Sequence, residues 1–171
     1  EGWRDIGVVL QSYLKRSAGD VARMNELGAR VRLCKGAYDE PASVAFRDKA
    51  EVDRSFVELT KLLLAEGNYP AIATHDERMV DATVDFHQKE GIGKEGFEFQ
   101  MLHGVRRDLQ QQLVKDGFNV RVYVPFGTHW YPYLMRRLAE RPANMLFMAG
   151  SVVKESPLGF LWPGGRNGGK R

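Results

Sequence analysis

The chain has 171 residues, of which 43% are hydrophobic and 27% are charged, a composition typical of a globular domain with one buried core. Its formal net charge of +3 is too small, and its Lys and Arg residues are too dispersed, to indicate nucleic acid binding. No apolar run reaches the roughly 18 residues needed to span a membrane. Cys34 is the only cysteine, which excludes an internal disulfide and a multi-cysteine metal site and fits a reducing compartment.

The apolar pattern alternates between short Val- and Ile-rich runs and longer segments of helical period. The short runs predict strands at residues 6–11, 31–33 running into 34 and 35, 71–74, 97–101 and 120–124. The longer segments predict helices at residues 19–28, 42–67, 77–90 and 105–117. Each predicted strand is followed by a helical segment, and this order indicates parallel strands joined by right-handed crossovers.

The spacing of the five strand–helix units is close to that of a (β/α)8 barrel, which needs roughly 250 residues for all eight units. We therefore expect an α/β fold of the TIM-barrel type, with about the last five units in this chain and the other units upstream of Glu1. The opening residues, EGWRDIGVVLQ, agree with this expectation because they carry neither an initiator Met nor a targeting segment. In this segment alone, two sheet edges would remain unpaired.

Cap and stop residues mark the ends of several predicted helices. Asp76 and Thr128 are suitable N-caps because their side-chain oxygens can accept a hydrogen bond from the first helical turn. Gly28, Gly67 and Gly117 stand where helices commonly stop.

Polar residues gather where the predicted strands end, which favours a barrel over an open sheet. In parallel α/β folds the active site forms at the carboxyl ends of the strands. The residues at these ends are Gln11; Arg32 and Lys35; Thr74, His75 and Asp76; Gln100, Leu102 and His103; and Tyr123. We therefore expect them to converge on one site.

Two adjacent arginines, Arg136 and Arg137, follow the last predicted strand on a short helix, in the segment THWYPYLMRRLAE. Neighbouring helical residues point about 100° apart, so one guanidinium can face a ligand while the other reaches around its edge, which suits a bound carboxylate. Tyr133 precedes the two arginines by one helical turn and shares their face. The alternative is a solvated basic face in which Arg136 pairs with Glu140.

Four segments closely resemble the proline dehydrogenase family of flavin-dependent enzymes. They are RLCKGAYDE at residues 32–40, ATHD at 73–76, FEFQMLHG at 97–104 and VRVYVPFGTHWYPYLMRRLAERPAN at 120–144. No single segment is decisive, but the four occur in order and at the spacings of the family, so together they are highly specific. The resemblance implies that residues 1–171 form the C-terminal part of one barrel domain. It ends at Asn144, and we expect residues 145–171 to form a loose tail.

The resemblance implies that the enzyme binds FAD and that Arg32 is an active-site residue beside the reactive flavin nitrogen. A cation there would favour the anionic character that develops on the ring during reduction. The other residues that match cofactor contacts of the family are Gln11, Lys35, Gly36, Ala37, Thr74 and His75. The FAD would be held without a Rossmann motif, because the chain has no G-x-G-x-x-G phosphate loop.

The implied substrate is proline, whose carboxylate Arg136 and Arg137 would hold on a last helix that packs over the barrel mouth. The residues that match the wall of the pyrrolidine pocket and its support are Tyr38, Leu102, Tyr123, Tyr133 and Glu140. Tyr123 would favour proline over hydroxyproline by filling space. The product would be pyrroline-5-carboxylate, and its formation would be the first step of proline catabolism. Electrons would pass to a quinone-type acceptor. We therefore expect a cytoplasmic protein that associates peripherally with the inner membrane.

Other interpretations of single residues stay open. Lys35 could be the Schiff-base lysine of an aldolase-type barrel or a solvated loop cation. His75 could bind a metal beside Asp76, although the remaining histidines form no dense ligand pattern and we expect no metal site. Cys34 has the strand parity of Arg32, but an unreactive buried thiol is the default for a lone cysteine. A third class of function is a non-catalytic barrel remnant that serves as a binding module.

Overall fold

The computed structural model of the chain describes residues 6–124, 126 and 127. Within this part, five strands form one parallel sheet in the order β1-β2-β3-β4-β5. The strands are β1 (Gly7–Gln11), β2 (Arg30–Cys34), β3 (Ala71–Ala73), β4 (Glu98–Leu102) and β5 (Val120–Tyr123). The helices are α1 (Ser17–Glu26), α2 (Lys49–Glu66), α3 (Glu77–Glu90) and α4 (Arg107–Lys115), with a 3-10 turn, η1 (Lys94–Gly96), before β4.

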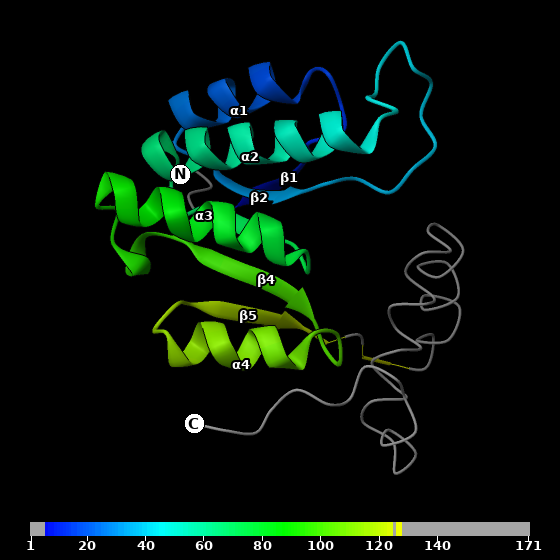
Figure 1. The fold of residues 1–171 in the computed structure, drawn as a ribbon. Coiled ribbons are helices and arrows are strands. Elements are labelled where there is room, and N and C mark those ends of the chain that lie inside the picture. The colour runs from blue at the N-terminus through cyan, green and yellow to red at the C-terminus, as the bar shows by residue number, and fades with distance from the viewer. Residues whose placement is uncertain (1–5, 125, 128–171) are drawn as a thin grey trace, which may run out of the picture.

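The helices cover one face of the sheet (Figure 1), with α1 and α2 packed together near β1 and β2 and with α4 beside β5. Alternate strand residues point toward these helices. Val31, Leu33, Ile72, Phe99 and Met101 are no more than 2% exposed and belong to one hydrophobic cluster. Burial of this apolar surface supplies the main drive for folding of the two layers.

The opposite face of the sheet, here called the inner face, carries the strand residues that alternate with those facing the helices. The register sets Arg32 beside Ala71, and Ala71 in turn beside Glu98. It also sets Gln100 beside Arg121. A parallel sheet with helices on one face and polar side chains on the other is the arrangement of five consecutive units of a TIM-type barrel. The predicted fold class is therefore confirmed.

An aromatic cluster lies at the amino ends of β4 and β5, on the helical side. The His87 ring packs against Phe97 and Phe118, with ring centroids 5.7 and 5.3 Å apart, and its Nδ1 is hydrogen bonded to the Ile92 carbonyl. Phe99 completes the cluster at 5.6 Å from both Phe97 and Phe118. His87 therefore has a structural place, at the end of the sheet away from the predicted site.

The structure corrects the start of the second predicted helix. The predicted helix at residues 42–67 begins at Lys49 instead, because the preceding segment is held as a turn. The N–H groups of Val44 and Ala45 donate to the Pro41 carbonyl, and the Phe46 N–H donates to the Tyr13 carbonyl at 2.8 Å. The predicted helix at 19–28 is α1, two residues earlier at each end. The predicted stops at Gly28, Gly67 and Gly117 are confirmed, since α1, α2 and α4 end just before them.

Candidate functional site

The carboxyl ends of β1 to β4, here called the rim, carry the polar residues that the sequence singled out there. Gln11 and Leu102 are the last residues of β1 and β4, and Lys35 directly follows β2. Thr74 and His75 directly follow β3. Because neighbouring strands are parallel and in register, these residues lie along one edge of the sheet.

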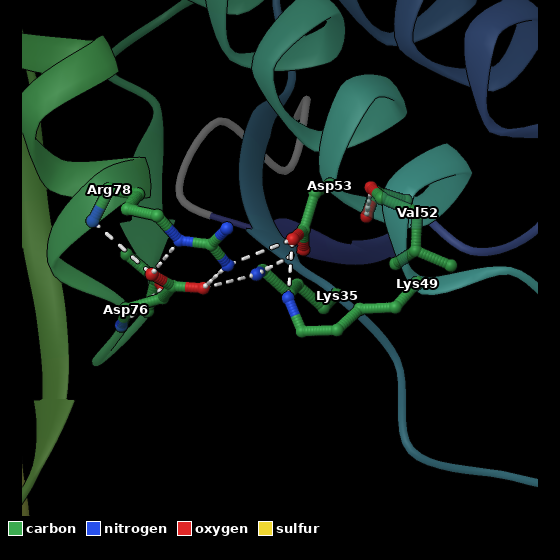
Figure 2. A network of polar contacts seen from close by, with 8 residues as sticks. Lys35, Lys49, Val52, Asp53, Asp76 and Arg78 are labelled. Atoms are coloured by element: carbon green, nitrogen blue, oxygen red, sulfur yellow. Dashed lines mark hydrogen bonds and ion pairs between the residues drawn. The ribbon is translucent and has the colours of Figure 1, made fainter.

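Lys35 is the centre of an ion-pair network at the rim (Figure 2). Its Nζ donates to Oδ2 of Asp76 at 2.8 Å and to Oδ1 of Asp53. Arg78 Nη2 donates to both carboxylates at 3.1 Å, and Lys49 donates to Asp53. The side chains of Lys35 and Asp53 are only 15% and 13% exposed. Three cations and two carboxylates leave the network with one excess positive charge.

The two carboxylates of this Lys35 network are held in the ionised form. Burial raises the pKa of Asp76, but hydrogen bonds from Arg78 and Lys35 lower it by more, so the pKa falls well below its usual range. Asp53 shows the same balance, with Lys35 and Lys49 as donors, and its pKa is also lowered. Asp76 additionally accepts from the Arg78 N–H at 3.2 Å, which confirms it as the N-cap of α3.

Thr74 and His75 make specific contacts directly after β3. Thr74 is buried, and its Oγ1 accepts from the Asp76 N–H at 3.1 Å. His75 Nε2 accepts from the Leu102 N–H at 2.9 Å. Burial and the positive charges of Arg106 and Arg32 lower the pKa of His75 to about 4. The imidazole is therefore neutral at pH 7, and because Nε2 accepts, its proton is on Nδ1.

Gly36 is required by its surroundings. Its φ is +102°, and a Cβ at this position would lie 2.1 Å from a ring carbon of Tyr13. Tyr13 is itself buried at 6% exposure, so its ring cannot move aside freely. The chain can pass this close to the ring because glycine has no side chain. It continues through Ala37 to Tyr38, which is 53% exposed.

Arg32 and Cys34 both lie on the inner face of β2, as their parity predicts. The Nε of Arg32 donates to Oε1 of Gln100, on β4, at 2.7 Å. The Sγ of Cys34 donates to the Leu10 carbonyl at 3.6 Å. Arg32 is thus anchored across the sheet rather than extended into solvent.

Three further predicted site residues stand at strand ends with different surroundings. The Gln11 carbonyl accepts from the Ser17 hydroxyl at 2.6 Å, which ties the end of β1 to the start of α1. Leu102 and Tyr123 are register partners at the ends of β4 and β5. Tyr123 is 53% exposed, so a large part of the residue is accessible to a ligand.

Several predicted residues fall outside the described part of the chain. They are Thr128, Tyr133, Arg136, Arg137 and Glu140. Their proposed carboxylate-binding and capping roles stay predictions.

Sequence reasoning missed two residues that the fold brings to the rim. Asp53 lies in the first turns of α2, where it follows Lys49 by four residues and carries no motif. Arg106 follows the FEFQMLHG segment, has a φ of +50° and bonds to Asp108 and Glu77. The only local signal for either residue was its charge, so the sequence could not distinguish them from surface residues.

The described residues also bear on membrane-spanning helices and metal sites. None of the helices in this part is long and apolar enough to cross a bilayer. Within the same part, no group of three or more His, Cys, Asp or Glu residues is arranged to hold a metal ion.

Comparison with known proteins agrees with the motifs. The family model described as "Proline dehydrogenase" matches residues 1–150. The proline dehydrogenase of Deinococcus radiodurans is 51% identical over 153 residues, which are 90% of this chain and 49% of that protein. Proline dehydrogenase 1 of Bacillus subtilis (strain 168) is 47% identical over 150 residues, 88% of this chain and 50% of that protein. This chain therefore spans about half the length of these curated relatives.

A solved structure gives the same result for the fold. The crystal structure of proline utilization A (PutA) from Bdellovibrio bacteriovorus, inactivated by N-propargylglycine, superposes with a TM-score of 0.76 at 30% sequence identity. The match covers 94% of this chain and 19% of that protein. The five-unit arrangement described above is thus found within a larger enzyme.

Proposed function

This chain belongs to the proline dehydrogenase family, and from that premise we propose that the complete protein oxidises L-proline to pyrroline-5-carboxylate with FAD as cofactor. The observation that carries the proposal is the rim, where Lys35 follows β2, Thr74 and His75 follow the neighbouring strand β3, and Arg32 lies close by within β2. Electrons would leave to a quinone-type acceptor. The remaining units of the barrel, which would complete the site, are proposed to lie in the rest of the protein.

The donors at the rim fit a flavin. Both carboxylates there, Asp53 and Asp76, are already bound by cations, and the Lys35 network keeps one excess positive charge. A neutral His75 and a cationic Arg32 are donors suited to the polar edge of a flavin and to the negative charge that it gains on reduction. When bound, FAD would supply the hydride acceptor.

The protein groups would act by positioning and by electrostatics. Arg32 would stabilise negative charge at the reacting edge of the cofactor. The turn at Gly36 would let backbone approach the ligand closely, with Gln11 and Ala37 as neighbouring contacts. Thr74 and His75 would supply further contacts from the end of β3. This chemistry requires close approach of the substrate carbon and little acid–base machinery from the protein.

The proposed substrate pocket uses residues from three parts of the chain. Arg136 and Arg137 would bind the carboxylate, because two guanidinium groups can orient it through charge-assisted hydrogen bonds. The aromatic and apolar wall of the pocket, with its supporting carboxylate, would consist of Tyr38, Leu102, Tyr123, Tyr133 and Glu140. Exclusion of water by this wall would strengthen the electrostatic contacts inside.

The contacts of Lys35 do not favour the aldolase alternative. A Schiff-base lysine must attack as a free amine, whereas Lys35 Nζ lies within hydrogen-bond distance of Asp53 and Asp76. Borohydride trapping of a substrate imine at Lys35, in a protein without flavin absorbance, would support the aldolase instead.

The test of the proposed function is a visible absorption spectrum of the full-length protein. We expect flavin bands in the purified protein and their bleaching on anaerobic addition of proline. A colourless protein, or flavin bands that proline leaves unchanged, would overturn the proposal. A proline analogue without its carboxylate serves as the control, because it lacks the group that Arg136 and Arg137 are proposed to bind.

A further inference from the structure

A chain of polar side chains crosses the inner face of the sheet from β2 to β5. Arg32 Nε donates to Oε1 of Gln100 at 2.7 Å, and Gln100 Nε2 donates to Oε1 of Glu98 at 2.6 Å. Arg121 then clamps Glu98 from β5, with Nε to Oε1 at 2.7 Å and Nη2 to Oε2 at 2.8 Å. We call Arg32, Gln100, Glu98 and Arg121 the inner-face relay.

The chemistry of the two ends determines the orientation of the amide between them. An arginine side chain can only donate and an ionised carboxylate can only accept. Gln100 must therefore turn its oxygen toward Arg32 and its nitrogen toward Glu98, and a flipped amide would lose both bonds. The side chain of Gln100 is held at both ends.

Glu98 is an anchor for this orientation. It is 5% exposed, and burial alone would raise its pKa. The hydrogen bonds from Arg121 and Gln100 outweigh that effect and lower the pKa, so Glu98 stays ionised at neutral pH. A buried, ionised carboxylate needs its donors, which keeps Gln100 Nε2 directed toward it.

Small residues on β3 make the crossing possible. The strand between β2 and β4 presents Ala71 and Ala73 to the inner face, as register partners of Arg32 and Gln100 respectively. A methyl group leaves room above the strand for the Arg32 side chain to reach β4. Arg32, Ala71, Glu98, Gln100 and Arg121 accordingly line one hollow on this face.

We propose that Gln100 is a positioning residue for Arg32. Glu98 and Arg121 hold Gln100 in turn, so the inner-face relay sets the position of the Arg32 guanidinium. This inference rests on the proposed function, in which Arg32 lies beside the flavin. None of the motif assignments gives Gln100, Glu98 or Arg121 such a role. Gln100 has the key place because it alone touches Arg32 within the relay.

The experiment compares variants of the full-length, flavin-loaded enzyme. Gln100→Leu keeps much of the side-chain volume but removes both hydrogen bonds. We expect flavin to be retained, the rate of flavin reduction by proline to fall about ten-fold, and KM for proline to change less than about two-fold, since misplacement of a charged group affects the reacting centre most. We also expect a more negative midpoint potential of the bound flavin, because the cation beside it is less well placed. Gln112→Leu, the same change on the exposed face of α4, should alter none of these quantities.

A second pair of variants tests the far end of the relay without touching Arg32 or its partner. Arg121→Met should shift the reduction rate and the midpoint potential in the same direction as Gln100→Leu, and Arg121→Lys should restore both toward wild type. Unchanged rate and potential in flavin-bound Gln100→Leu would overturn the proposal. If Gln100→Leu fails to hold flavin, equal potentials in the two Arg121 variants would overturn it. A wild-type protein that proline does not bleach would instead refute the proposed function, so the two failures are distinguishable.

Discussion

The Nε2 of His75 accepts the backbone N–H of Leu102 at 2.9 Å, so a side chain at the end of β3 binds the last residue of β4. This bond requires an unprotonated Nε2, because a protonated imidazole has no acceptor nitrogen. It joins two strand ends at the rim, and its strength depends on the protonation of one ring.

His75 should make stability depend on pH. Its folded pKa of about 4 lies below its ordinary value of 6.5, so the stabilising contribution is complete above pH 6.5 and is lost as pH falls toward 4. The loss should be on the order of 3 kcal/mol. His75→Gln keeps an acceptor for the Leu102 N–H and cannot titrate in this range. Urea unfolding of the full-length protein at about pH 7.5 and about pH 4.5 should therefore show a smaller pH effect in the variant than in wild type. An equal loss in both proteins would contradict the assignment.

Removal of one carboxylate from the Lys35 network should be costly. Asp53→Asn keeps the shape of the side chain but removes the charge that binds Lys35, Lys49 and Arg78. We expect a loss of about 2 kcal/mol in the free energy of unfolding, the usual range for a hydrogen bond to a charged group. The matched control is Asp39→Asn, because the Asp39 side chain is 90% exposed and forms an ion pair with Arg47 at the surface. Chemical denaturation would compare the two, and equal effects would count against a structural role for the network.

Replacement of Gly36 by alanine should disturb the rim more than the same change at another glycine of positive φ. Gly36→Ala combines backbone strain with a clash against the Tyr13 ring, and we expect a loss of about 3 to 5 kcal/mol. Gly104 has a φ of +78° but open space around its Cβ position, so Gly104→Ala should cost only the strain, about 1 kcal/mol. The difference in thermal midpoint between the two variants measures the contact with Tyr13. Indistinguishable midpoints would show that the ring can move aside.

The carboxylate site can be tested by Arg136→Met and Arg137→Met. Either change should weaken proline binding by about 2 to 5 kcal/mol, because the substrate carboxylate would lose a partner in a pocket from which water is excluded. A titration of the flavin spectrum with a non-oxidisable cyclic carboxylate would measure the affinity. Arg23→Met, which removes a surface arginine paired with Glu26, should have no effect. Unaltered affinity in both the Arg136 and the Arg137 variant would favour the solvated basic face and a non-catalytic remnant.

Much of the fold could be predicted because its signals are local. The alternation through Val31, Arg32 and Leu33 sorts one strand into a helical side and an inner side, and the structure confirms that sorting. Asp76 was recognised as a cap because an N-cap acts on residues two or three positions away. The boundary of α2 was missed for the opposite reason. The turn before it is held by the Tyr13 carbonyl, which lies more than thirty residues upstream of Phe46, and no local pattern reports such a partner.

The class of fold, the strand ends where polar residues gather, and the family can all be read from the sequence, because periodicity, caps and motifs are carried by residues close together in the chain. Which of those residues bind one another depends instead on how the elements pack. Arg32 meets Gln100 across 68 positions, and Lys35 meets Asp53 and Asp76 across 18 and 41. These pairings depend on the register of parallel strands, on small alanines in the strand between, and on where a helix begins, and those features arise only when the separate elements pack together.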